Sequence, residues 1–232
     1  MSRIPRFAII PTNGRSCLAD CLAAIRNQVD HVLVVWTDQK VGHHQAFPEW
    51  AQRPPDGVTI IYQFDALREV NISCWWNAGL RHVEQAASIH SDPRWSKWDV
   101  AILNDDAIVP EGWFDAASGT MRQMGVAAAC SGGRGPMPVL HTQPGPVPLD
   151  TRLCGFAFML AGEMGLRGNE SLKWYFTDDW MDWESRKLGG MVMIPGFHVE
   201  HLYPNGQVTP EIQEQIAKDA QTFVDIYGMR PW

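Results

Sequence analysis

Two adjacent carboxylates stand at the end of an apolar run in the middle of the chain. The run is 99–103, and Asn104, Asp105 and Asp106 follow it directly. Like charges side by side at the end of a buried strand are costly unless a cation lies beside them. Mg²⁺ and Mn²⁺ suit such a place, because they accept a few carboxylate oxygens and keep their other positions for water and phosphate oxygens. The alternative is that both side chains only cap the following turn, where aspartate is common.

Three further carboxylates and two histidines lie in the last third of the chain. Asp178, Asp179 and Asp182 are three and four residues apart, so a helix would carry them on adjoining faces. Asp178 would also suit the start of that helix, where it would serve only as a cap. His198 and His201 follow a predicted strand, and neutral imidazole is a competent metal ligand, although a loop histidine is more often a surface residue.

Apolar runs that alternate with helical patterns predict the elements that position these residues. Strands are predicted at 7–11, 31–36, 58–62, 99–103 and 126–130, and helices after Ser16, over 71–89 and from Pro110. This alternation predicts an α/β fold with helices on both faces of the sheet. Ligands gather at the carboxyl ends of strands in such sheets, where Pro11, Asp38 and Asp106 fall.

The second half of the chain has a different pattern. Segment 132–148 is rich in glycine and proline and has Arg134 as its one charged residue, so we expect an ordered loop or a mobile lid. Strands are predicted at 154–161 and 191–195, a loop and a helix at 174–188, and an amphipathic helix at 211–227.

The composition excludes several classes of protein. The chain has 232 residues, of which 45% are hydrophobic and 19% charged, as in globular proteins rather than disordered ones. Its net charge of −7 disfavours nucleic acid as a partner. Five cysteines without a CxxC pair predict reduced thiols. No apolar run is long enough for a membrane span and no signal peptide is evident, so we expect a cytoplasmic protein.

Seven segments in chain order resemble the family 2 glycosyltransferases of the GT-A fold. Segments 7–25, 32–38 and 71–80 are similar to that family's first strand and helix, its second strand and its asparagine-containing region. Segment 101–114 looks like the DxD segment in an Asn-x-Asp form, and 154–160 like the strand under the acceptor site. Segment 176–190 resembles the acidic helix that supplies the catalytic base, and 198–206 the segment whose histidine ligates the metal.

The resemblance implies a fold, a reaction and a set of site residues. It implies one GT-A domain over 1–232, a mixed sheet flanked by helices, with a nucleotide-binding half at about 1–131, an acceptor and catalytic half at about 150–206, and a C-terminal helix at 207–232. The donor would be a nucleoside-diphosphate sugar, with a UDP-sugar favoured over other nucleotides, and the resemblance does not identify the acceptor. Mn²⁺ or Mg²⁺ would be held by Asp106 and His201, with His198 as runner-up, and transfer would invert the anomeric centre. Nucleotide contacts are expected at Pro11, Thr12, Asn13, Asp38, Asn77 and Asp105. The base is expected to be Asp179, with Asp178 and Asp182 as alternatives.

Two other classes of protein remain open at this point. A metal-dependent nucleotidyltransferase or phosphohydrolase also pairs carboxylates with Mg²⁺, but it would want a longer phosphate loop than 13–15 offers. A sugar-binding module without enzymatic activity would need tryptophans such as Trp174, Trp180 and Trp183, but not the carboxylates. Release of nucleotide, release of pyrophosphate or release of neither separates the three classes.

Overall fold

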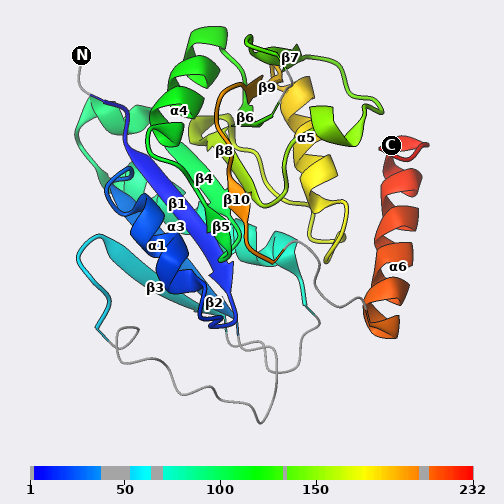
Figure 1. The fold of residues 1–232 in the computed structure, drawn as a ribbon, viewed down its shortest axis with the longest axis horizontal. Helices are drawn as coiled ribbons and strands as arrows, with labels where there is room; N and C mark the ends of the chain where they lie inside the picture. The colour runs from blue at the N-terminus through cyan, green and yellow to red at the C-terminus, as the bar shows by residue number, and fades with distance from the viewer. Residues whose placement is uncertain (1–2, 38–52, 64–69, 133–134, 204–208, 232) are drawn as a thin grey trace.

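The computed structural model describes residues 3–37, 53–63, 70–132, 135–203 and 209–231. An eight-stranded mixed sheet crosses the molecule (Figure 1). Its strands, in spatial order, are β3 (Val58–Gln63), β2 (His31–Thr37), β1 (Arg6–Thr12), β4 (Asp99–Leu103), β8 (Ala157–Ala161), β6 (Ala128–Ser131), β9 (Met191–Ile194) and β7 (Val139–His141). The first four are parallel to one another, whereas β8 runs antiparallel to both β4 and β6. The carboxyl end of β4 therefore meets the amino end of β8.

Helices cover both faces of this sheet, as the sequence predicts. The α-helices of the described residues are α1 (Leu18–Ile25), α3 (Ile72–Ile89), α4 (Trp113–Met124), α5 (Thr177–Lys187) and α6 (Pro210–Tyr227), of which all but α6 pack on the sheet. Along β1, Ala8 and Ile10 pack in one core cluster with α1 and α4, while Phe7 and Ile9 pack in a second cluster with α3. This alternation is what a strand buried on both faces requires, since successive side chains point to opposite faces. The predicted α/β fold is confirmed.

The C-terminal helix packs on a helix rather than on the sheet. A third cluster joins α6 to α5 through Phe176, Trp183, Ala220 and Phe223, and Figure 1 shows α6 beside α5 at the edge of the molecule. Thr209 begins α6 by accepting a hydrogen bond from the Ile212 N–H at 3.4 Å. Among the described residues no helix combines the length and the apolarity that crossing a membrane demands.

Several details differ from the sequence-based expectations. The segment predicted as a loop at 132–148 contains β7, which pairs antiparallel with β9. The helix expected to open at Pro110 begins at Trp113, because Gly112 before it is in the left-handed conformation with φ 80°. A second, two-stranded sheet joins β5 (Ala107–Ile108) to β10 (Glu200–His201), and no local pattern predicts it.

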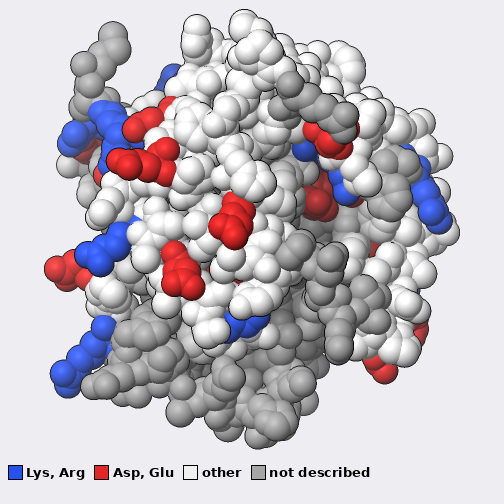
Figure 2. Space-filling model, viewed as in Figure 1, with Lys and Arg blue, Asp and Glu red and all other residues white. Residues whose placement is uncertain are grey.

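Charges of both signs are interspersed over the described part of the face drawn in Figure 2, without a broad basic surface there. This distribution agrees with the acidic balance of the whole chain, with 19 Lys and Arg against 26 Asp and Glu.

All five cysteines are free thiols, as expected.

Candidate functional site

A cavity of about 860 Å³ opens where β1, β2 and β4 end and β8 begins. One part of its wall comes from the residues that follow β1 and β4, another from the start of α3, and a third from the segment that leads into α5. The lining includes Pro11, Thr12, Asn13, Arg15, Thr37, Trp75, Asn104, Asp105, Asp106, Arg152, Gly155, Phe156, Trp174, Tyr175, Asp178, His201 and Ile212. Residues far apart in the sequence thus meet around one space.

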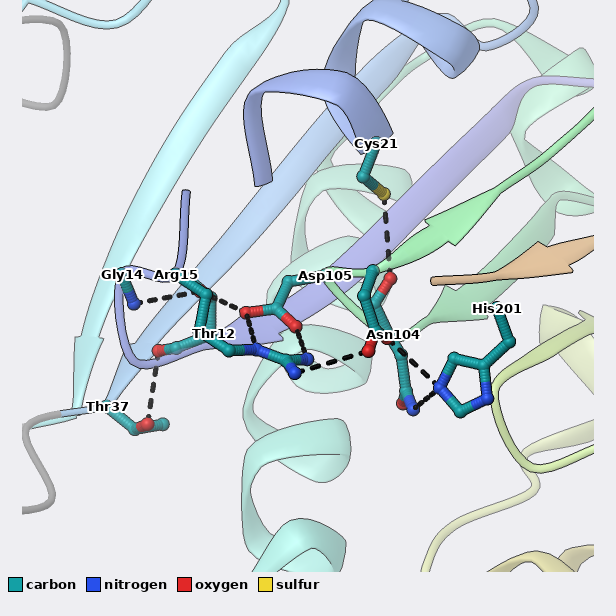
Figure 3. A network of polar contacts seen from close by, with 9 residues as sticks. Thr12, Gly14, Arg15, Cys21, Thr37, Asn104, Asp105 and His201 are labelled. Atoms are coloured by element: carbon teal, nitrogen blue, oxygen red, sulfur yellow. Dashed lines mark hydrogen bonds and ion pairs between the residues drawn. The ribbon is translucent and has the colours of Figure 1, made fainter. Parts of the chain in front are cut away.

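The first wall is a network of polar contacts centred on Asp105 (Figure 3). The Thr12 hydroxyl donates to Oδ2 of Asp105 at 2.7 Å, and the Gly14 N–H donates to the Thr12 hydroxyl at 2.9 Å. The Arg15 guanidinium binds both oxygens of Asp105, and its Nη1 lies 3.2 Å from Oδ2 of Asp106. Arg15 therefore places a positive charge against the carboxylate pair that is costly on its own.

Charge states in this network follow from the contacts. Burial raises the pKa of Asp106, but the His201 imidazole and the Arg15 guanidinium outweigh it and bring that pKa below its ordinary value. Burial lowers the pKa of Arg15, but the hydrogen bond and charge of Asp105 and the charge of Asp106 raise it overall. Asp106 is thus an anion and Arg15 a cation throughout the neutral range.

His201 reaches Asp106 through the two-stranded sheet. In the β5–β10 ladder His201 lies opposite Ala107, and the Leu202 N–H donates to the Asp106 carbonyl at 3.0 Å. Phe156 stacks on the imidazole, with ring centroids 4.5 Å apart and planes 13° apart. Nε2 of His201 then lies 3.1 Å from Oδ1 of Asp106. His198 is exposed and does not line the cavity.

The Asp106–His201 pair has the features of a metal half-site. Oδ1 of Asp106 is buried and has no aligned hydrogen-bond donor, although Nε2 of His201 is near. Two neighbouring ligands of an octahedral ion with bonds of about 2.1 Å would lie about 3 Å apart, close to the separation found. No group of three or more His, Cys, Asp and Glu side chains suited to a metal occurs in the described ranges. These residues fit a divalent cation that takes its other ligands from water and phosphate oxygens.

The three carboxylates of α5 differ in their surroundings. Asp178 is partly exposed and lines the cavity, and burial raises its pKa. Asp179 is 3% exposed and pairs with Arg152. Asp182 is 1% exposed and is bound by Arg186, and burial raises its pKa to about 6 despite that partner. Of these three side chains, the geometry turns Asp178 toward the cavity and gives the other two an arginine partner.

Gly155 makes room for Asp178. A β-carbon built on Gly155 would lie 2.5 Å from Oδ2 of Asp178 and 2.9 Å from its Cγ, which is closer than real atoms approach. Gly155 precedes β8 and also lines the cavity. The absence of a side chain at 155 is therefore what lets the Asp178 carboxylate occupy this place.

Arg186 of α5 holds the proline- and glycine-rich segment 135–148 against that helix. The Arg186 side chain is buried, and besides binding Asp182 it donates to the carbonyls of Gln143 at 3.4 Å and Gly145 at 3.1 Å. It is therefore committed to these partners rather than free for a diphosphate, and it ties the proline- and glycine-rich segment to α5. Arg134 lies outside the described residues.

The predicted nucleotide contacts divide into three groups. Pro11, Thr12, Asn13 and Asp105 line the cavity, as does Thr37, whose hydroxyl donates to the Thr12 carbonyl at 3.1 Å. Asp38 lies outside the described residues. Asn77 is not among the lining residues, because its side chain binds the backbone of Gly168 instead. The Asn77 amide donates to the Gly168 carbonyl at 2.9 Å and accepts from the Gly168 N–H at 2.8 Å.

Aromatic residues cover the remaining wall. Trp75, Trp174 and Tyr175 line the cavity. Trp180 donates to the Arg167 carbonyl at 3.0 Å, and Trp183 of α5 is buried against α6, so neither is among the lining residues.

Sequence reasoning missed Arg15 as a site residue. The available signal was a basic residue in the turn that follows the first strand.

Comparisons with known proteins support the fold. No protein-family model matches the chain, and no curated protein matches it significantly in sequence. Its structure is similar to residues 1–349 of S. aureus TarS, a glycosyltransferase, with a TM-score of 0.52 at 10% identity over 97% of this chain and 72% of that one. The same fragment in complex with UDP-GlcNAc gives 0.52 at 12% identity, over 95% of this chain and 67% of that one.

A third structure, TarS itself, gives a TM-score of 0.51 at 13% identity, over 95% of this chain and 40% of that one. The chain therefore spans less than half of that longer protein. At these identities the likeness establishes a shared architecture, a GT-A-like α/β fold with a large mixed sheet.

Proposed function

We propose that this protein is a glycosyltransferase that moves a sugar from a nucleoside-diphosphate donor to an acceptor hydroxyl, with a divalent cation and with inversion. One observation carries the proposal: the Asp106–His201 pair and Asp178 line the same cavity. A cation site and a candidate base around one space are what transfer from a diphosphate leaving group needs. The GT-A-like fold shared with TarS, which has been solved with UDP-GlcNAc, supports a UDP-sugar as donor.

The donor would lie over the ends of β1, β2 and β4. Thr12, Asn13 and Thr37 offer hydrogen-bonding groups to the nucleoside. Arg15 is close enough to Asp106 to hold a diphosphate oxygen beside that carboxylate, because a guanidinium binds phosphate oxygens in a fixed geometry. Asp106 and His201 would hold Mn²⁺ or Mg²⁺, which when bound supplies positive charge against the departing diphosphate.

Asp178 would take the proton of the acceptor hydroxyl as that oxygen attacks the anomeric carbon. Its exposure to the cavity and the room left by Gly155 favour it over Asp179 and Asp182, which are buried and paired with arginines. A direct displacement with one base inverts the anomeric centre. Trp174 and Tyr175 would face the acceptor, since aromatic faces stack on the C–H faces of sugars.

The test is the fate of UDP-GlcNAc incubated with the protein and Mn²⁺. We expect release of UDP, with water as a slow acceptor, loss of this release with chelator, and an inverted anomer of the freed sugar by proton NMR. Release of GlcNAc 1-phosphate and UMP, by cleavage of the bond between the two phosphates, would instead favour a nucleotidyltransferase or phosphohydrolase, and binding without release a sugar-binding module. A second UDP-sugar, tried in parallel, separates a wrong sugar from a wrong reaction.

A further inference from the structure

The C-terminal helix reaches the cavity wall through one buried carboxylate. Asp219 of α6 is 0% exposed. Its Oδ2 accepts from the backbone N–H groups of Trp174 at 2.8 Å and Tyr175 at 2.9 Å, and its Oδ1 from the Lys173 N–H at 3.1 Å. The Gln215 side chain donates to the same Oδ1 at 2.8 Å. One carboxylate thereby fixes three consecutive peptide units, and two of them carry side chains that line the cavity.

The next residue along the chain is held by the same helix. Phe176 has φ 62° and is, in the described parts of the chain, the one non-glycine residue with positive φ. A bulky residue adopts this conformation only where its surroundings impose it. The Phe176 ring is buried against Phe223 of α6, with ring centroids 6.0 Å apart. The left-handed turn that starts α5 is therefore held by α6.

The opposite side of this segment is fixed by α3. The Ile72 N–H donates to the Lys173 carbonyl at 2.7 Å, and the Ser73 hydroxyl donates to the Leu172 carbonyl at 2.7 Å. Segment 172–176 is thus held between the start of α3, which lines the cavity, and the middle of α6. Asp178 follows two residues after Phe176, so the direction in which its side chain leaves α5 depends on this turn.

We propose that α6 is a positioning element of the active site, in which Asp219 and Phe223 hold segment 173–176 so that Asp178 faces the cavity. The proposal rests on the proposed function only for the role of Asp178 as base. Asp219 is a positioning residue, since it touches neither the cavity nor Asp178 and acts through the backbone of the segment it binds.

Two variants and one matched control test it. Asp219→Asn keeps the size of the side chain but turns one acceptor oxygen into a donor that faces N–H groups. Phe223→Leu keeps an apolar side chain but removes the ring that packs against Phe176. A cooperative unfolding transition shows whether each variant is folded, and if Asp219→Asn is not, Phe223→Leu alone tests the proposal. Asp225→Asn is the control. Asp225 lies on the same helix and, like Asp219, accepts a hydrogen bond from a glutamine four residues earlier, here from Nε2 of Gln221 to Oδ1 at 2.7 Å, but Asp225 is exposed.

Two readouts separate positioning from general weakening. The first is hydrolysis of UDP-GlcNAc with Mn²⁺, for which we expect kcat to fall about 10- to 100-fold in Asp219→Asn while KM stays unchanged. The second is carbon-13 NMR titration of the Asp178 carboxyl, assigned by its loss in Asp178→Asn, which requires no turnover. Because burial raises the pKa of Asp178, both variants should lower it toward the ordinary range, and Asp225→Asn should leave it unchanged.

The outcomes are distinguishable. The proposal is overturned if Asp219→Asn or Phe223→Leu is folded and if both its kcat and the pKa of its Asp178 equal those of the wild type. A wild type without turnover on any UDP-sugar overturns the proposed function instead, and the titration of Asp178 then decides alone whether α6 sets its place.

Discussion

Arg15 lies against both carboxylates that the end of β4 brings together. Its contacts with Asp105 and Asp106 offset a like-charge repulsion that the protein would otherwise have to tolerate beside a buried strand end. Arg15 is 42% exposed along its side chain, whereas Asp106 is 1% exposed. The Arg15 guanidinium is therefore the part of this network that can move toward a ligand, whereas the two carboxylates are fixed.

Asp106→Asn should abolish Mn²⁺-dependent binding of UDP while the protein stays folded. The amide keeps the shape of the side chain but loses the charge that a divalent ion needs. Isothermal titration with UDP, with Mn²⁺ and then with chelator, measures the effect. Asp92→Asn, a half-buried aspartate that pairs with Arg94 just after α3 and does not line the cavity, is the control. Equal metal-dependent affinity in Asp106→Asn and the wild type would contradict the assignment.

Asp178→Asn should reduce transfer by about 10²–10⁴ while UDP binding stays normal, because a general base touches the acceptor rather than the diphosphate. In the wild type the rate should rise with pH as Asp178 loses its proton. Since burial raises the pKa of Asp178, the midpoint should lie above the ordinary aspartate value of about 3.9. A pH–rate profile checks this.

Asp179→Asn is the matched neighbour and should retain the pH profile of the wild type. If Asp179→Asn loses turnover and Asp178→Asn keeps it, the base is the next residue along the helix. The sequence alone left this open, because the register of α5 depends on the left-handed Phe176, and a phenylalanine gives no local signal for that conformation.

At the scale of elements, α3 packs unusually close to β1. A β-carbon on Gly79 of α3 would lie 2.6–2.9 Å from three carbons of Ile9, which is fully buried. Gly79→Ala should therefore destabilise the protein by about 1–3 kcal/mol, as overpacking does, despite the better helix propensity of alanine. Urea unfolding gives the free-energy change.

Gly119→Ala in α4 is the control for that substitution. Gly119 is exposed, and a β-carbon there would have no atom within 4 Å. Only the propensity gain remains, so this variant should stabilise by about 0.5–1 kcal/mol. If Gly79→Ala and Gly119→Ala change the free energy of unfolding in the same direction, the close approach of α3 to β1 does not determine the effect of Gly79→Ala.

The elements that the sequence predicted are those with a strong local pattern. The strands at 7–11, 31–36 and 99–103 are confirmed as β1, β2 and β4, because strands buried on both faces are continuous apolar runs. β5, β10 and β7 have two or three residues each and exist through pairing with distant partners, which no local pattern contains. The same limit applies to Asn77, whose partner Gly168 lies 91 residues later.

For the whole molecule, ligand binding should appear as added stability. A nucleotide and a cation that bind the native state together, at about 100 times the dissociation constant, add about 2.7 kcal/mol. For a chain of this size that is a rise in Tm of about 5–10 °C. Because Asp106 and His201 offer two protein ligands, Mn²⁺ alone should raise Tm much less than UDP and Mn²⁺ together.

Differential scanning fluorimetry with UDP, with Mn²⁺, with both and with UDP plus Mg²⁺ measures these shifts. His201→Ala should lose most of the joint effect, and His198→Ala, with its exposed side chain, should keep it. A joint shift no larger than that of UDP alone would mean that nucleotide binding does not involve a cation.

The ladder of two residues between β5 and β10 has a consequence for how such a site diversifies. His201 enters from a segment outside the eight-stranded sheet, held by one short pairing and by the Phe156 ring. Substitutions in that segment alter the side chain that faces Asp106 without disturbing a strand of the main sheet. Selection can therefore exchange the partner of Asp106 independently of the scaffold. Under the proposed function, descendants of one ancestor could then differ in the cation they prefer while retaining the same core.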